Sequence, residues 1–154
     1  MFDAPEIVQT STQPTAVLHL TIPRSDIREV MGPSISEVHS AVAAQGIAPA
    51  GPWFTHHLRR PTDTFDFEVC IPVSRPVAVS GRVQPAEWPA MTVARATYTG
   101  PYEGLHGAWS EFHDWLAANH HNTAPDLYER YLVGPDTTPD PAAWRTELNC
   151  PILP

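Results

Sequence analysis

The sequence predicts an α+β domain built from two copies of one β-α-β-β unit, and two observations favour this class. The first is an internal repeat, because three short segments recur in the same order in both halves of the chain, as expected of a duplicated structural unit. The pairs are residues 36–39 with 110–113, 68–72 with 147–151, and 15–21 with 91–97. The second is the hydrophobic pattern within each half, which alternates between strand-like and helix-like periods.

In the first half, residues 15–22 are β-branched or apolar and predict a strand. Ser34 and Glu37 fit a capping box, which predicts that a helix begins there and ends before Gly46. Residues 52–58 and 64–72 then predict a strand pair, because apolar and polar side chains alternate along the second segment.

The second half predicts a strand at 91–98, a helix at 104–119 and a strand pair at 127–133 and 143–149. The helix has an apolar arc formed by Leu105, Ala108, Trp109, Phe112, Trp115 and Leu116. The proline-rich segment 74–90 is interpreted as a linker with a short strand near 79–83. We therefore expect one domain, residues 1–154, with halves at about 14–73 and 79–152. Related by a pseudo-twofold axis, they would carry both helices on one side and a ligand groove opposite.

The composition disfavours several classes of protein. The chain has 154 residues and a net charge of −8, and Arg59-Arg60 is no more than a basic pair, so nucleic-acid binding is disfavoured. The first residues do not resemble a secretory signal, and no apolar run approaches the length of a membrane span. We expect a cytoplasmic protein whose two cysteines are reduced.

Three segments resemble one known family. They are Arg-Ala-Thr-Tyr-Thr-Gly-Pro-Tyr at 95–102, Phe-Glu-Val-Cys-Ile-Pro-Val at 67–73, and Tyr-Glu-Arg-Tyr-Leu at 128–132 with the proline- and threonine-rich residues that follow. In order and spacing they resemble the GyrI-like effector-binding domains, which occur alone and at the C-terminus of AraC-type and MerR-type regulators. The resemblance covers roughly residues 15–152.

This resemblance implies binding of small, often planar and lipophilic molecules, including cationic drugs. The residues before 15 leave no room for a helix-turn-helix, so a stand-alone protein rather than a DNA-binding regulator is expected. Cys70 stands where the family usually has glycine. Some stand-alone members are similar to hydrolases that open the cyclopropane ring of DNA-alkylating natural products.

Glu147 and Glu68 are the first candidate site residues. They occupy equivalent positions in the two halves and alternate with apolar neighbours, so both are predicted to point away from the helices. A carboxylate in an aromatic groove binds cations, and burial that raised its pKa would make it a general acid or base. The alternative is a solvated strand glutamate, or one paired with a neighbour such as Arg145.

Aromatic residues on strands and turns are candidate walls for a planar ligand. The alternative is that they fill the core, which is the interpretation given to Trp109, Phe112 and Trp115. The candidates are Tyr98, Tyr131, Trp88, Trp53 and Tyr102.

No metal or cofactor is predicted. His56-His57 would point to opposite faces of a strand, and no spacing typical of zinc ligands, phosphate loops or dinucleotide sites occurs. Nucleophile motifs are also missing, and Cys70 and Cys150 are interpreted as structural thiols.

The leading functional hypothesis is a binder of a lipophilic, planar, neutral or cationic compound, with Glu147 as the anchor. A cofactor-free hydrolase is a second hypothesis, in which Glu147 or Glu68 is the base and Tyr98 or Tyr131 donates to a carbonyl oxygen. A module that binds a protein partner is the third. The sequence leaves all three open, together with the oligomeric state.

Overall fold

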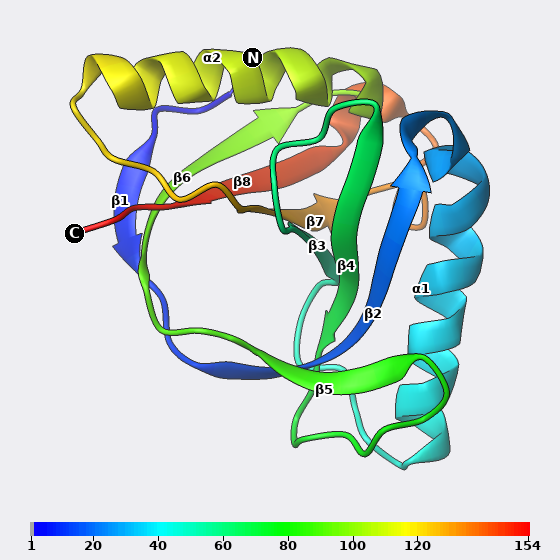
Figure 1. Ribbon diagram of the computed structural model, residues 1–154. Helices are drawn as coiled ribbons and strands as arrows, with labels where there is room; N and C mark the ends of the chain where they lie inside the picture. The colour runs from blue at the N-terminus through cyan, green and yellow to red at the C-terminus, as the bar shows by residue number, and fades with distance from the viewer. Residues whose placement is uncertain (1) are drawn as a thin grey trace. The chain divides into compact units, whose positions relative to one another are not determined.

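The structure is a computed structural model that describes residues 2–154 and divides into two compact units. Unit 2 is Ser11–Ala90, and unit 1 comprises residues 2–10 together with Met91–Pro154. The strands and the helices that pack on them confirm the predicted α+β class (Figure 1).

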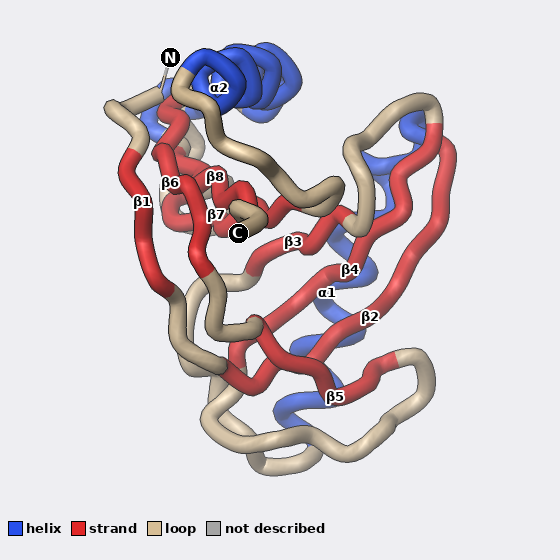
Figure 2. The backbone as a smooth tube through the Cα atoms, turned by 60° about the vertical axis from the view of Figure 1, so that its left-hand side comes forward, coloured by secondary structure: helices blue, strands red, loops and turns tan. Residues whose placement is uncertain are grey.

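Unit 2 is a four-stranded antiparallel sheet in the order β3-β4-β2-β5, with one helix lying along β2 and β4 (Figures 1 and 2). Its elements are β2 (Gln13–Pro23), α1 (Ile27–Ala44), β3 (Phe54–His57), β4 (Thr64–Pro72) and β5 (Val83–Trp88). Alternate residues of β2 and β4 pack with α1 in one core, which includes Leu18, Phe67, Val69 and Val38.

Unit 1 has the corresponding strand order β7-β8-β6-β1, also antiparallel, and α2 packs against β6. Its elements are β1 (Glu6–Gln9), β6 (Thr92–Thr99), α2 (Leu105–Ala118), β7 (Leu127–Val133) and β8 (Arg145–Pro151). The predicted arc of α2 forms the core, with Trp109, Phe112 and Leu116 buried against Ala96 and Leu148. Short 3-10 turns lie at Arg24–Asp26, Tyr102–Gly104 and Pro141–Ala143.

Strands β1 and β5 do not pair with the strands that directly follow them in the sequence. β5 precedes β6 along the chain but pairs with β2, whereas β1 precedes β2 but pairs with β6. The prediction missed β1 and placed a short strand at 79–83 instead of at Val83–Trp88. Both strands pair on one side within their own unit, and β5 contains Pro85, which an edge strand tolerates because one row of its amides is not needed for pairing.

The predicted capping box of α1 is wrong. The helix begins at Ile27, and Ser34 lies buried inside it, next to Pro33. Proline removes one helical hydrogen bond, but Ile27, Val30 and Met31 pack against the core and hold the first turns in place. Glu37 accepts hydrogen bonds from Arg82. The predicted end is confirmed, because Gly46 has a φ of +67° just after the helix.

Gly104 predicts a steric effect at the start of α2. A Cβ atom added there would lie 2.0 Å from the Tyr98 hydroxyl oxygen, whereas one added at Gly107 would meet nothing within 4 Å. We expect Gly104→Ala to lower the free energy of unfolding by about 1–3 kcal/mol through overpacking. Gly107→Ala is the matched control and is expected to raise it by about 0.5–1 kcal/mol, because glycine is a poor helix former. Urea denaturation measures both, and equal effects would contradict the clash.

Candidate functional site

Glu147 points away from α2, as predicted, but it lies in an ion-pair cluster. Its side chain is 7% exposed, and Arg130 Nη2 lies 2.9 Å from Oε1. Arg95 Nε lies 3.2 Å from the same oxygen, and Asn149 Nδ2 donates to it at 3.0 Å. The predicted alternative partner, Arg145, is not the one that the structure shows. Two guanidinium groups bind this one carboxylate, so it presents no net negative charge to a ligand.

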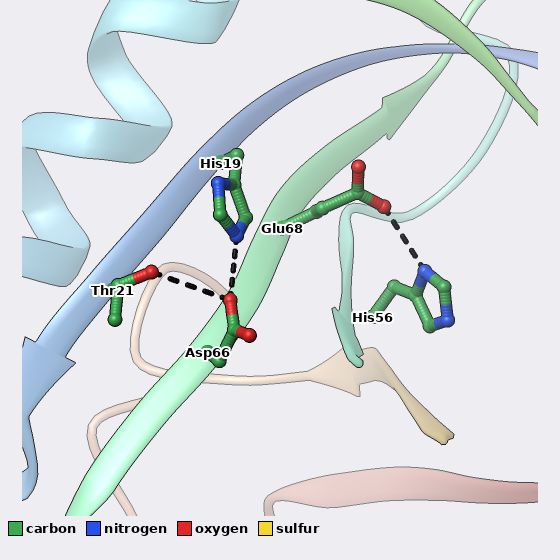
Figure 3. A network of polar contacts seen from close by, with 5 residues as sticks. All are labelled: His19, Thr21, His56, Asp66 and Glu68. Atoms are coloured by element: carbon green, nitrogen blue, oxygen red, sulfur yellow. Dashed lines mark hydrogen bonds and ion pairs between the residues drawn. The ribbon is translucent and has the colours of Figure 1, made fainter. Parts of the chain in front are cut away.

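Glu68 also points away from its helix, and it forms one of two histidine–carboxylate pairs on unit 2 (Figure 3). His56 Nδ1 lies 3.0 Å from Glu68 Oε1, and His19 Nε2 lies 2.6 Å from Asp66 Oδ1. The hydrogen bond with His19, followed by that from Thr21, lowers the pKa of Asp66. The side chain of Glu68 is 25% exposed and belongs to a polar network on the sheet.

The predicted aromatic residues fall into different places. Tyr98 faces α2, is 5% exposed and donates a hydrogen bond from its hydroxyl to the Pro101 carbonyl oxygen at 2.7 Å. Burial raises its pKa. In unit 2, Trp88 packs edge-on against Phe54 at 4.9 Å between ring centroids, and Trp53 packs against the hydrophobic core. Tyr98 is thus a core residue whose hydroxyl proton is donated to a backbone carbonyl oxygen.

A buried carboxylate that the sequence analysis did not select, Glu129, lies on the face of β7 that α2 covers. It is opposite Leu148 in the register of β7 and β8, and it is 8% exposed. Trp109 Nε1 donates to Oε2 at 2.7 Å, and the Tyr131 hydroxyl donates to Oε1 at 2.6 Å. Both donors are neutral groups that orient the carboxylate.

Two further aromatic rings extend this group. The ring of Tyr102 lies 5.9 Å from that of Tyr131 and 4.8 Å from that of Trp144. We call Glu129, Trp109, Tyr131, Tyr102 and Trp144 the Glu129 cluster. Of the predicted candidates, the structure brings Tyr131 and Tyr102 together here, and it places the others elsewhere.

Tyr102 reports on the charge within the Glu129 cluster. Burial raises the pKa of Tyr102 to about 12, and the carboxylates of Asp136 and Glu129 contribute. We expect alkaline titration of tyrosinate absorbance to show a late step whose amplitude Tyr102→Phe lowers by one tyrosine, with Tyr98 free to contribute the rest. The step is absent in urea, where tyrosine ionises at about pH 10. Because the folded pKa is the higher one, stability is complete below about pH 10 and falls as the pH rises towards 12. A Tyr102→Phe protein that keeps the full amplitude of the late step would contradict the assignment.

Both cysteines are buried thiols. Neither Cys70 nor Cys150 forms a disulfide. Burial, followed by the charge of Glu68, raises the pKa of the Cys70 thiol well above its ordinary value. Among residues 2–154 no three His, Cys, Asp or Glu side chains are grouped to hold a metal ion. In the same part of the chain no helix has the length and apolarity to cross a membrane.

The comparison with protein families decides the assignment. The model of the GyrI-like small molecule binding domain matches residues 3–153. The chain belongs to the GyrI-like family. No curated protein sequence matches it significantly.

Solved structures show the same GyrI-like fold at low sequence identity. The EcmrR C-terminal domain has a TM-score of 0.87 at 20% identity, with 97% of each chain covered. The EcmrR chain in a complex with DNA scores 0.86 at 21% identity, with 98% of this chain and 57% of that chain covered, so this chain spans little more than half of it.

Two further structures are more distant. A hydrolase from Listeria innocua scores 0.68 at 12% identity, covering 97% of this chain and 91% of that one. SAV2435 bound to tetraphenylphosphonium scores 0.67 at 12% identity, covering 98% and 94%. At these identities the likeness supports the fold alone. The groove predicted from the sequence stays a prediction.

Proposed function

We propose that this GyrI-like chain binds a lipophilic aromatic molecule, neutral or cationic with the cation preferred, at the Glu129 cluster. The observation that carries the proposal is a buried carboxylate held by two neutral donors among aromatic side chains. Burying a carboxylate in such surroundings is costly, and a cation with aromatic groups offsets the cost through charge and cation–π contacts. The bound tetraphenylphosphonium of the related SAV2435 fold is a ligand of this class.

Glu129 replaces Glu147 as the proposed anchor. The predicted anchor is bonded to two arginine side chains, whereas Glu129 accepts hydrogen bonds from the Trp109 indole and the Tyr131 hydroxyl. A cation near Glu147 would meet two guanidinium groups of its own sign. The electrostatics therefore disfavour Glu147 as the anchor of a cation.

The test compares two ions of one shape and opposite charge, tetraphenylphosphonium and tetraphenylborate. Trp109 and Trp144 belong to the cluster, so quenching of tryptophan fluorescence follows binding. We expect the wild type to prefer the cation by at least about tenfold, and Glu129→Gln to weaken cation binding by about 10- to 100-fold, or ~1.4–2.8 kcal/mol. Glu111→Gln, an exposed change on α2, is the control and is expected to bind like the wild type.

The possible outcomes separate the parts of the proposal. Equal binding of both ions by the wild type would contradict a carboxylate anchor. A preference for the cation that survives Glu129→Gln would place the anchor elsewhere. Loss of binding in Glu129→Gln with an unchanged urea midpoint excludes unfolding as the cause.

Hydrolysis of an electrophilic ligand is a second candidate, favoured by the 2.6 Å hydrogen bond between Tyr131 and Glu129. In the reaction, Glu129 takes a proton from one water, the water oxygen bonds to a cyclopropane carbon, and the ring C–C bond breaks. Its electron pair moves onto a conjugated carbonyl oxygen, to which Tyr131 donates a proton. The carboxyl proton of Glu129 returns to Tyr131, so the net change is addition of water.

Turnover distinguishes catalysis from binding. The protein is incubated with an excess of a cyclopropane-bearing alkylator, and the ring-opened product is counted per protein chain. An enzyme gives many equivalents, and Glu129→Gln or Tyr131→Phe removes most of the rate. Product that stops at one equivalent rejects the enzyme and leaves the binder.

A further inference from the structure

The face of the unit 1 sheet turned away from α2 carries a second polar group, which we call the Arg95–Arg130 cluster: Arg95, Arg130, Glu147 and Asn149. Strand register builds it, because Arg130 is directly opposite Glu147 and Arg95 is directly opposite Asn149. Arg95 Nε donates to Asn149 Oδ1 at 2.7 Å and lies 3.2 Å from Glu147 Oε1. Arg130 Nη2 lies 2.9 Å from the same carboxylate oxygen. The two guanidinium groups are thus fixed on either side of one carboxylate.

Most N–H groups of these arginines have no protein acceptor among residues 2–154. Each guanidinium presents five donors in a planar fork. In the described part of the chain, Arg95 uses Nε and Arg130 uses Nη2. Arg130 Nε is itself buried without a partner, which is uncommon for a buried donor and points to an acceptor supplied from outside the chain. The side chains are 21% exposed at Arg95 and 32% exposed at Arg130, so part of each remains accessible.

The charge balance determines what this cluster attracts. Two guanidinium groups against one carboxylate leave one net positive charge, on a chain whose overall net charge is −8. Oxyanions match the arginine fork, because two parallel N–H groups reach two oxygens at once. A cation has no reason to bind here.

We propose that the Arg95–Arg130 cluster is a binding site for the oxyanion group, carboxylate or phosphate, of a small molecule. Glu147 and Asn149 orient the two arginines, and the remaining N–H groups hold the ligand. This site is separate from the Glu129 cluster and does not depend on it, because Glu129 and Arg130 are neighbours on β7 and point to opposite faces.

Glu147 gives the proposal a distinctive consequence. The carboxylate competes with any bound oxyanion for the same guanidinium groups, and its negative charge repels the ligand. Glu147→Gln keeps an oxygen acceptor but removes this charge. The variant is therefore expected to bind oxyanions more tightly, by about threefold or more, whereas a merely structural cluster would show no gain.

The test follows the arginine Nε–H signals of the ¹⁵N-labelled chain by NMR, with benzoate and inorganic phosphate as separate probes and sodium chloride holding the ionic strength constant. We expect saturable shifts of the Arg95 and Arg130 signals, with a dissociation constant on the order of 1 mM. Arg130→Gln should abolish saturation. Arg82→Gln, which removes an exposed arginine paired with Glu37, should leave it unchanged.

The results decide the proposal in each case. Saturation by benzoate alone identifies a carboxylate ligand, by phosphate alone a phosphate ligand, and by both a general oxyanion site. Shifts that stay linear with concentration, or that match those of the Arg82 signal, overturn it. Because the wild type gives this readout, a Glu147→Gln protein that fails to fold does not affect the decision, and loss of cation binding at Glu129 leaves it unchanged.

Discussion

Replacing Glu147 with leucine is expected to lower the free energy of unfolding by about 3–5 kcal/mol, the range for breaking a buried ion pair by removing one partner. The reason is the state in which the variant leaves Arg95 and Arg130. These side chains are largely buried, at 21% and 32% exposed, and both lose the carboxylate that binds them. Two like charges then face each other in a medium that solvates them poorly. Urea denaturation at neutral pH measures the loss.

An exposed pair of the same chemistry is the control. Arg82 Nη2 lies 2.6 Å from Glu37 Oε1, but the side chains are 59% and 38% exposed. Glu37→Leu is therefore expected to cost about 0–1 kcal/mol, as for surface ion pairs in general. If both variants lost the same small amount, the arginines of the Arg95–Arg130 cluster would be solvated well enough not to need Glu147.

The sequence predicted the elements whose signal lies in local periodicity. Strands β4 and β7 begin and end at the predicted residues, and the apolar arc of α2 is the buried face. These patterns are local because a strand repeats every second residue and a helix about every 3.6 residues. The exchange of β1 and β5 was missed because strand partners are set by contacts far apart in the chain, which local periodicity does not encode.

The start of α1 was missed because the prediction relied on the capping box. Ser34 and Glu37 have the residue types and spacing typical of a helix start, yet the helix extends back to Ile27. The apolar residues at 27, 30 and 31 were the contrary signal, since they continue the helical stripe that packs on the core. Tertiary packing outweighed the local preference.

The candidate site was predicted only in part, because its contacts also join residues far apart in the chain. The orientation of Glu147 and Glu68 away from the helices was correct, but their partners, Arg95, Arg130 and His56, come from neighbouring strands and could not be read from spacing. One feature of the sequence could have identified Glu129 as a candidate site residue. It shares the inward face of residues 127–133 with Leu127, and an acidic residue at a core-facing position is unusual.

Phe112→Ala is expected to have an equally large effect on stability and, through α2, an effect on binding. Phe112 is 0% exposed and packs against Phe2 and Trp109, with ring centroids 5.7 and 5.8 Å away. Removing a buried phenyl ring leaves a cavity and costs about 3–5 kcal/mol. Phe112→Leu keeps most of the volume and is expected to cost less than about 1.5 kcal/mol. Urea denaturation again compares the two variants.

The binding consequence follows from the position of Phe112 on the helix. It lies one turn beyond Trp109, and the indole of Trp109 donates the 2.7 Å hydrogen bond to Glu129. With the phenyl ring gone, α2 loses the contact that holds this indole over the sheet, so Glu129 is less well oriented. Even under conditions where Phe112→Ala is folded, we expect its affinity for a lipophilic cation to fall by about 3- to 10-fold, or ~0.7–1.4 kcal/mol, with Phe112→Leu close to the wild type. Full affinity in a folded Phe112→Ala protein would show that Trp109 does not depend on this packing, and the indole would then have to be positioned by the sheet side of the cluster.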